Sequence, residues 1–254
     1  MQLTGNTILI TGGGTGIGRG LAEAFHKLGN KVIIAGRRKQ ALDDTTAANP
    51  GMKSATLNIE DPKAIRAFAS EMSANYPALN VVIQNAGIMR LENLSAHQED
   101  LAAAESIIAT NLLGPIRLNA ALMPQLQKQP VATIMTVSSG LAFVPLTITP
   151  TYSATKAAIH SFTQSLRYQL RSTSIEVLEL IPPYVQTDLL GGAEDPRAMP
   201  LDKYITEVMA VLKTEPKSGE ICVENVKALR FAAEKGNYDA VFNGLNDAWA
   251  KAAH

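Results

Sequence analysis

The sequence predicts an α/β protein built on a doubly wound parallel sheet that is flanked by helices. Short runs of apolar and β-branched residues alternate with longer stretches whose apolar residues recur at helical spacing. This alternation is typical of repeated strand–helix–strand units. The first unit carries a glycine-rich turn between its strand and its helix. Because 254 residues without a recognisable linker or repeat suit one large α/β unit, we expect a single domain over residues 1–254.

Charge and composition exclude several classes of function. Lys plus Arg and Asp plus Glu each number 23, so the net charge is zero and no basic footprint favours nucleic acid. No stretch of about 18 apolar residues occurs, and no signal-like N-terminus is present, so we expect no membrane partner. The single cysteine, Cys222, allows no intrachain disulfide and is typical of a reducing compartment. We therefore expect a cytoplasmic protein.

Six strands are predicted, each a short apolar run bounded by turn residues. The first lies between Asn6 and Gly12, and Pro182 and Pro183 end the last one abruptly. The others cover about residues 31–35, 54–59, 79–84, 131–137 and 174–181. We recognise no later strand with a glycine-rich end.

Helices are predicted after these strands. Asp61 followed by Pro62 is a helix start, because aspartate caps an N-terminus and proline suits the first helical position. Trp249 lies in a helical stretch at the end of the chain and is interpreted as a packing residue. The longer helices are expected at about 98–128, 151–172 and 238–253.

The glycine-rich turn indicates a dinucleotide. Its residues follow the pattern T-G-x-x-x-G-x-G, at Thr11, Gly12, Gly16 and Gly18. Glycine permits a sharp turn and close approach of a ligand, and a helix that begins there directs free N–H groups at a phosphate. The strand before and the helix after distinguish this arrangement from a merely tight connection.

The end of the second strand indicates which dinucleotide is bound. An acid there would bond the ribose hydroxyls of NAD, whereas an arginine favours the phosphate of NADP. The chain has Gly36, Arg37 and Arg38 at this corner. Two solvated arginines that open a helix are the alternative. We expect NADP(H) to be preferred, with Arg37 at the phosphate, and NAD(H) to remain possible.

Tyr152 and Lys156 form a second constellation, four positions apart at the start of a helical pattern. Residues with this spacing share a helix face. A nearby ammonium favours the phenolate, so we expect the pKa of Tyr152 to be lowered from about 10. Such a tyrosine can donate and accept a proton, although an exposed helical pair is the alternative.

These motifs together resemble the short-chain dehydrogenase/reductase family. In order they are Thr11–Gly18, Asn85–Ala86–Gly87, Asn111, Ser138–Ser139, Tyr152 with Lys156, and Val185–Gln186–Thr187, and the resemblance covers about residues 5–190. It implies a single Rossmann-type domain with a roughly seven-stranded sheet. It also implies an oxidoreductase that transfers hydride reversibly between a nicotinamide cofactor and a carbonyl or alcohol carbon.

The resemblance implies four catalytic residues. Tyr152 would be the acid/base, and Lys156 would lower its pKa and hold the nicotinamide ribose. Ser139, with Ser138 as the fallback, would bond the substrate oxygen. Asn111 would fix a water that links Lys156 to solvent, unless it only bonds its own helix backbone.

The resemblance also implies a set of cofactor-binding residues. Thr187 would hold the carboxamide of the nicotinamide, Asn85 would lie along the adenosine side, and Asn58 and Ile59 would border the adenine. The full set is Gly12, Gly13, Gly14, Thr15, Gly16, Ile17, Gly18, Arg37, Asn58, Ile59, Asn85, Tyr152, Lys156, Val185 and Thr187. The four histidines lack ligand spacing, so we expect no metal site.

Three positions depart from the family pattern. Asn58 stands where aspartate is common, Gln84 stands where an asparagine precedes Asn-Ala-Gly, and Pro183 replaces the glycine of Pro-Gly. Proline removes a backbone donor, so no main-chain N–H contact is available at residue 183.

The resemblance places a substrate lid at about residues 189–213. Met89, Arg90, Leu91, Phe143 and Tyr184 are mostly apolar and favour a rather hydrophobic carbonyl or alcohol substrate, although core packing under the lid explains them equally. By family analogy we expect a homo-oligomer, a dimer more than a tetramer. A nucleotide-binding regulator or sensor with little turnover, or a structural protein, would be expected to lack part of the catalytic set.

Overall fold

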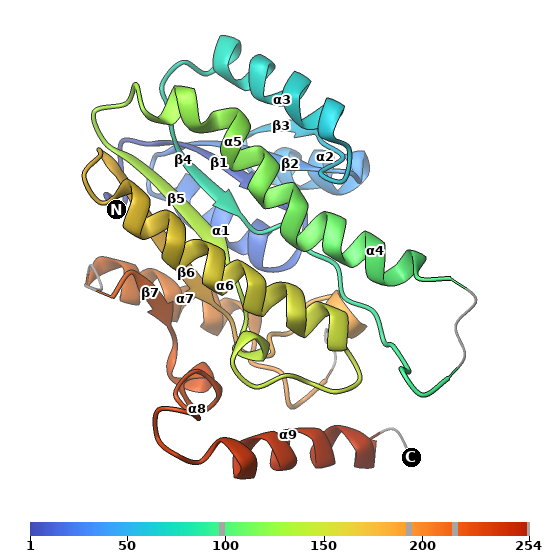
Figure 1. Ribbon diagram of the computed structural model, residues 1–254. Helices are drawn as coiled ribbons and strands as arrows, with labels where there is room; N and C mark the ends of the chain where they lie inside the picture. Colours follow the sequence, from blue (N-terminus) through green and yellow to red (C-terminus); the bar gives the residue numbers. More distant parts are fainter. Residues whose placement is uncertain (97–99, 192–194, 215–217, 253–254) are drawn as a thin grey trace.

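Seven parallel strands form one sheet in the order β3-β2-β1-β4-β5-β6-β7, shown in Figure 1. The structure is a computed structural model that describes residues 1–96, 100–191, 195–214 and 218–252. The strands are β1 Thr7–Thr11, β2 Lys31–Gly36, β3 Lys53–Thr56, β4 Leu79–Gln84, β5 Ala132–Val137, β6 Ile175–Ile181 and β7 Glu220–Cys222. The order reverses between β1 and β4, which creates the crevice where such sheets bind ligands.

Helices cover both faces of the sheet, so the prediction of a doubly wound fold is confirmed. Buried side chains of α1, α2 and α7 pack on one face, and those of α3, α5 and α6 pack on the other. The helices are α1 Gly16–Lys27, α2 Lys39–Ala48, α3 Pro62–Asn75, α4 Ala102–Ile108, α5 Gly114–Leu126, α6 Pro150–Leu170, α7 Leu201–Lys213, α8 Lys227–Arg230 and α9 Tyr238–Ala252.

β7 is a strand that the sequence patterns do not reveal, and it completes the seven-stranded sheet that the resemblance implies. It has three residues and pairs in parallel with β6, from Glu179 opposite Glu220 to Ile181 opposite Cys222. Only Ile221 is fully buried, so the strand has no apolar run that marks it in the sequence. The third strand is also shorter than predicted, because it ends at Thr56 and leaves residues 57–59 as a connection.

The helix predicted over 98–128 is divided in the structure. Its start falls partly on residues 97–99, which lie outside the described part of the chain, and the described helix begins at Ala102. A π-helical turn, Ala109–Leu113, joins α4 to α5. A Cβ on Gly114 would lie 2.7 Å from a side-chain carbon of Ile59, so glycine allows α5 to approach the connection after β3.

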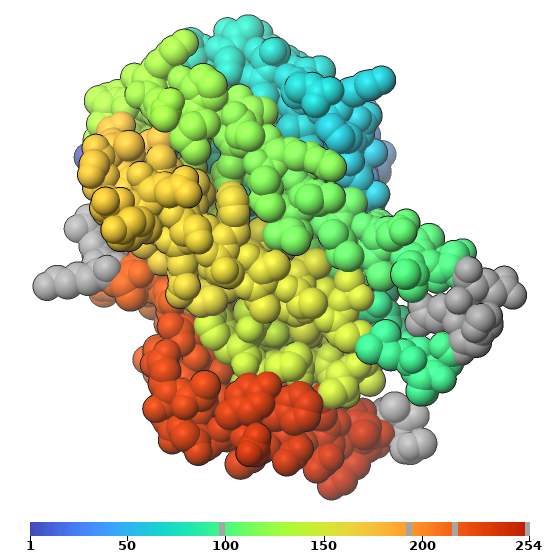
Figure 2. Space-filling view, viewed as in Figure 1, coloured from blue at the N-terminus to red at the C-terminus, as the bar shows by residue number. Residues whose placement is uncertain are grey.

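The predicted cap of α3 is present, since Asp61 Oδ1 accepts a hydrogen bond of 2.7 Å from the backbone N–H of Lys63. In α9, every side chain of residues 238–251 is at least partly exposed. Figure 2 shows this C-terminal segment lying against the rest of the molecule as a separate red layer. Among the described residues, no helix is long and apolar enough to span a membrane.

Candidate active site

Two adjoining cavities lie at the carboxyl ends of the strands. A groove of about 450 Å³ extends along the ends of β1, β2 and β4, and a smaller cavity of about 140 Å³ lies beside it. Seven residues line both spaces: Ile17, Asn85, Gly87, Met89, Thr187, Leu189 and Leu190. The groove therefore leads directly into the smaller cavity.

The glycine turn gives the groove its shape and its donors. Gly12 and Gly16 have φ angles of +67° and +53°, a region that favours glycine. A Cβ on Gly18 would lie 2.3 Å from the Gly12 carbonyl oxygen, so that position accepts no larger residue without movement. Thr15 caps α1 without a side-chain hydrogen bond, and the first turn contains no acid. The N–H groups of this turn are therefore suited to an anion.

Most of the predicted cofactor residues line one of the two spaces. The groove is lined by Gly12, Gly14, Thr15, Gly16, Ile17, Arg37, Ile59, Asn85 and Thr187, and the smaller cavity by Tyr152, Lys156 and Val185. Gly13 lies behind the lining, where a Cβ would be 2.5 Å from Ile34 Cγ2. Asn58 is not among the lining residues; its side chain is exposed and accepts a hydrogen bond from Glu60 N at 3.2 Å.

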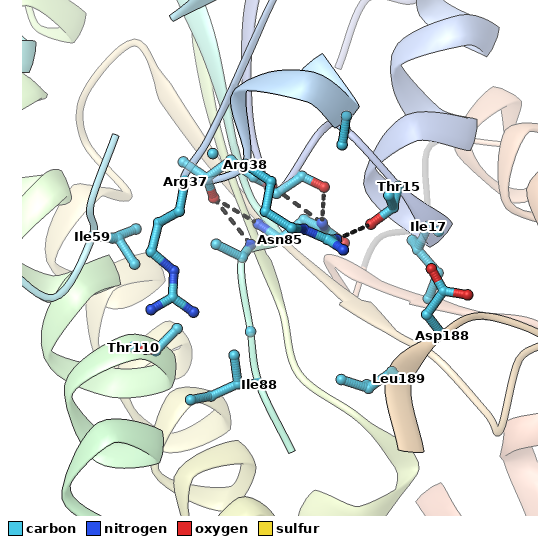
Figure 3. Close-up of a pocket in the computed structure, with 18 of the residues that line it drawn as sticks. Thr15, Ile17, Arg37, Arg38, Ile59, Asn85, Ile88, Thr110, Asp188 and Leu189 are labelled. Carbon is cyan, nitrogen blue, oxygen red and sulfur yellow. Dashed lines mark hydrogen bonds between the residues drawn. The ribbon is translucent and has the colours of Figure 1, made fainter. Parts of the chain in front are cut away.

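Both arginines after β2 line the groove, but they point in different directions (Figure 3). Arg37 Nη1 lies 2.8 Å from Glu60 Oε1, an oxygen that also accepts from the Thr110 hydroxyl at 2.8 Å. Arg38 Nη2 donates to Thr15 Oγ1 at 2.9 Å, beside the glycine turn. From the sequence, only Arg37 is expected at the phosphate. Arg38 is a cofactor candidate that its adjacent position in the sequence could have indicated.

Tyr152, Lys156 and Ser139 meet in the smaller cavity. All three are buried, with exposures of 6%, 5% and 7%. Tyr152 and Lys156 lie one turn apart near the start of α6, and Ser139 lies two residues after the end of β5. Lys156 Nζ donates to the Val137 carbonyl at 2.8 Å, which holds the ammonium beside the end of β5.

Burial changes the pKa values of this pair. Desolvation raises the pKa of Tyr152 to about 12, and hydrogen bonding with Ser139 acts in the opposite direction. The expected lowering of the tyrosine pKa by Lys156 is therefore wrong for this structure, because burial disfavours the phenolate more strongly. Burial also lowers the pKa of Lys156 to about 8, while the negative charge of Glu179 acts to raise it.

Asn111 clamps the segment that follows β4. Its Oδ1 accepts from the backbone N–H of Ile88 at 2.9 Å, and its Nδ2 donates to the Ile88 carbonyl at 2.9 Å and to Thr155 Oγ1 at 3.3 Å. The interpretation that it bonds its own helix is therefore excluded. A Cβ on Gly87 would lie 3.5 Å from Asn111 Oδ1 and 3.7 Å from Lys156 Nζ, so these three residues meet at one point.

A buried polar network behind the catalytic residues has no motif in the sequence. Ser138 Oγ donates to Glu179 Oε1 at 2.6 Å, and His160 Nδ1 lies 2.9 Å from Glu179 Oε2. The Ser138 hydroxyl is thus engaged, which leaves Ser139 as the serine beside Tyr152. The one sequence signal for this network is a glutamate inside the apolar run of β6.

His160, Glu179 and Glu220 bring ligand-type atoms within 4.8 Å of one another. The groups already have protein partners, because Arg230 donates to the two Glu220 oxygens at 2.8 and 3.0 Å. A guanidinium beside this cluster supplies the positive charge that a cation would bring. The three residues are far apart in the sequence and have no ligand spacing, so the sequence does not show that a histidine and two carboxylates gather here.

The smaller cavity has mostly apolar walls that come from distant parts of the chain. Pro182, Pro183 and Tyr184 follow β6, and the Pro182 carbonyl accepts from Gly140 N at 2.9 Å, which ties together the connections after β5 and β6. Leu229, Leu245 and Trp249 come from the C-terminal helices. Trp249, which is expected from the sequence to be a packing residue, lies in the cavity wall.

Comparisons with known proteins agree with this geometry. The family model described as short chain dehydrogenase matches residues 6–198. The uncharacterized oxidoreductase DltE of Bacillus subtilis is 40% identical over 251 residues, which are 97% of this chain and 98% of that protein.

Two solved structures have the same fold. A short chain dehydrogenase from Burkholderia cenocepacia, in complex with NADP, aligns with a TM-score of 0.81 and 26% identity over 96% of this chain and 99% of its own. One from Streptomyces avermitilis has a TM-score of 0.80 and 25% identity over 100% and 98%. With its glycine turn and the gathered Ser139, Tyr152 and Lys156, the chain belongs to the short-chain dehydrogenase/reductase family of oxidoreductases.

Proposed function

We propose that the protein interconverts a carbonyl compound and its alcohol with NADP(H), and that Tyr152 is the acid/base. One observation carries the proposal: Tyr152, Lys156 and Ser139 are buried together in an apolar cavity that adjoins a groove with an anion-binding turn. The bound nicotinamide would supply or accept the hydride. The side chains around it would orient the substrate and manage the proton.

The residues of the groove fit an adenine dinucleotide that carries a 2′-phosphate. The glycine turn and the uncapped N-terminus of α1 suit the pyrophosphate. Arg37 and Arg38 provide two guanidinium groups at the end of β2, where an acid would favour NAD. The Burkholderia cenocepacia relative was solved in complex with NADP, which supports the same choice here. NAD(H) would bind more weakly, because these guanidinium groups would lack a phosphate partner.

The catalytic side chains would divide the proton chemistry between them. Tyr152, with its pKa raised to about 12, is a neutral phenol at ordinary pH and can donate its proton to the substrate oxygen during reduction. Ser139 would donate a hydrogen bond to the same oxygen and hold it near the phenol. Below its pKa of about 8, Lys156 is an ammonium that would stabilise the phenolate left behind. In oxidation the proton would move in the reverse direction.

Comparing the parent protein with Tyr152→Phe tests this proposal. Oxidation of NADPH would be followed by absorbance with a panel of small aldehydes and ketones, and NADPH affinity would be measured separately. We expect turnover to fall by roughly 10²–10⁴-fold while NADPH binding persists. Tyr168→Phe is the matched control, because Tyr168 lies on the same helix and is 67% exposed. Turnover that survives Tyr152→Phe would refute the assigned role, and tight binding without any turnover would favour a nucleotide sensor.

The predicted lid remains a proposal in a narrower form. Leu189 and Leu190 line both cavities, so the segment that begins there is suited to cover a bound substrate. The later part is anchored, because Asp195 and Arg197 contact Tyr184 and Trp249 and because α7 contributes buried side chains to the core, so we propose lid movement only before residue 195. Residues 192–194 of the proposed lid lie outside the described part of the chain.

Homodimer formation through the helices around Asn111 and Tyr152 also remains a proposal. Large apolar side chains on these helices are exposed, with Ile108 at 39% and Leu113 at 37%. Light scattering on the purified protein would test it, and a mass of one chain at micromolar concentration would contradict it.

A further inference from the structure

The C-terminal helix α9 forms part of the wall of the catalytic cavity and does not line the nucleotide groove. Leu245 and Trp249 of α9 line the cavity together with Tyr152 and Ser139, and neither contributes to the groove. The two residues lie one helical turn apart, so they present one face of α9 to the cavity. Figure 1 shows that α9 follows a separate path below the sheet and reaches this position after α8.

A ring of four residues holds the end of α9. The Tyr184 and Trp249 rings meet edge to face with centroids 5.3 Å apart, and the Arg197 guanidinium lies 4.3 Å from the centre of the Trp249 ring. Asp195 Oδ2 closes the ring, since it accepts from Arg197 Nη2 at 2.6 Å and from the Tyr184 hydroxyl at 3.2 Å. Trp249 is therefore attached to the segment after β6, which itself lines the cavity.

Asn246 fixes α9 at a second point. Its Oδ1 accepts from the backbone N–H of Thr147 at 2.7 Å, and its Nδ2 donates to the Pro145 carbonyl at 3.2 Å. Pro145 and Thr147 flank Leu146, another residue of the cavity wall. Because α9 has only partly buried side chains, these polar contacts and the four-residue ring set its position more than core packing does.

The chemistry of the cavity restricts what it can hold. Among the described residues that line it, Lys156 is the only cation, and its Nζ is already bonded to the Val137 carbonyl. The Arg197 guanidinium is instead paired with Asp195 and lies over the Trp249 ring. Because the Lys156 ammonium is assigned to the Tyr152 phenolate, a carboxylate or phosphate on the substrate would lose its hydration without gaining a counter-charge of its own. The volume without a nucleotide is about 140 Å³, similar to an apolar cavity of about 150 Å³ that binds benzene in another protein, so a bound nicotinamide would leave room only for a small substrate.

We propose that Leu245 and Trp249 of α9 are specificity-determining residues that contact the apolar part of the substrate and limit it to small, uncharged carbonyl compounds. This inference rests on the proposed function for the reaction, but the binding surface itself can be tested without turnover. Benzaldehyde has the size and chemistry that the cavity accepts, and benzoate is its charged counterpart of almost equal shape.

Trp249 is the only tryptophan of the chain, so its fluorescence reports on this wall directly. The protein with NADP⁺ bound cannot reduce an aldehyde, so it would be titrated with benzaldehyde and, separately, with benzoate. We expect a saturable change in emission with benzaldehyde and at least about tenfold weaker binding of benzoate. A change that is linear in concentration, or equal for the two probes, would overturn the proposal.

Variants of Leu245 test the size limit. Leu245→Phe adds volume to the wall and is expected to weaken benzaldehyde binding by about tenfold, without changing NADPH affinity. Leu245→Ala is expected to raise kcat/KM for naphthaldehyde relative to benzaldehyde by about tenfold. Asp247→Ala is the matched control, because Asp247 is exposed on the same helix.

The outcomes separate this inference from the proposed function. Saturable benzaldehyde binding that depends on Leu245, without reduction of any carbonyl, would support the role of Leu245 and Trp249 and refute the proposed reaction. Turnover that depends on Tyr152 but is unchanged in both Leu245 variants would support the proposed reaction and refute the role of α9 in substrate choice.

Discussion

Lys156 Nζ lies 5.5 Å from the centre of the Tyr152 ring, one helical turn further along α6, and donates to the Val137 carbonyl at 2.8 Å. The lysine is thus oriented by the end of β5 while remaining next to the tyrosine. Burial acts on both groups, raising one pKa and lowering the other, so at neutral pH a phenol and an ammonium coexist in the cavity. This pairing suits proton donation to a substrate oxygen.

The first prediction concerns pH. The pKa of Lys156 is lowered to about 8, so the ammonium is present below that pH and is lost as pH rises through it. We expect kcat/KM for carbonyl reduction to fall above about pH 8, since Tyr152 keeps its proton until about 12. Glu179→Gln removes a negative charge that raises the pKa of Lys156, so the fall in kcat/KM should begin at a lower pH. Glu176→Gln, on the exposed side of the same strand, should leave it unchanged.

The second prediction concerns the choice of nucleotide. NADPH should bind more tightly than NADH, because Arg37 and Arg38 line the groove at the end of β2. Arg37→Ala or Arg38→Ala should each reduce the preference by about tenfold or more, since a hydrogen bond to a charged group contributes about 1.5–3 kcal/mol. Calorimetric titration with both nucleotides measures the effect, and Arg66→Ala on the exposed side of α3 is the control. Equal affinities in the parent protein would contradict this assignment.

The third prediction concerns the glycine turn. A Cβ at position 18 would lie 2.3 Å from the Gly12 carbonyl oxygen, so Gly18→Ala must displace the turn. We expect a loss of about 1–3 kcal/mol in stability and a marked loss of NADPH affinity. Gly244→Ala is a suitable comparison, because a Cβ there has no neighbour within 4 Å and lies in a helix. Thermal unfolding of both variants with and without NADPH distinguishes the two positions.

The fourth prediction concerns Asn111. Asn111→Ala leaves the backbone N–H and carbonyl of Ile88 without their partner, which should lower the free energy of unfolding by about 1–3 kcal/mol. The segment after β4 lines both cavities, so NADPH affinity should fall too. Urea unfolding and a nucleotide titration measure these effects. Asn75→Ala, at an exposed position, should change neither quantity.

The fifth prediction concerns the only thiol. Burial raises the pKa of Cys222 to about 12, and the negative charge of Glu220 acts in the same direction. The side chain is therefore a neutral thiol at pH 8. Alkylation by iodoacetamide at that pH should be much slower in the folded protein than in urea. Rapid labelling of the folded protein at the unfolded rate would show that the thiol is more accessible than the structure indicates.

Local sequence patterns were sufficient for most of the fold. The predicted strand at 79–84 matches β4, and Asp61 caps α3 as expected, because both depend on residues close together in the chain. The edge strand β7 was missed, since three residues with one buried side chain carry too little periodicity to be recognised. It forms because the edge of β6 offers hydrogen-bond partners, which no local pattern records.

The sequence by itself determined the glycine turn and the order of the catalytic motifs, because those depend on residue type and spacing. Tertiary structure decided what surrounds them. It raised the pKa of Tyr152 by burial, engaged Ser138 with Glu179, and directed Asn111 to Ile88. It also placed Trp249 in the wall of the cavity, about a hundred residues after Tyr152 in the chain. Burial and contacts between distant segments arise only when the whole chain packs, so no local pattern contained them.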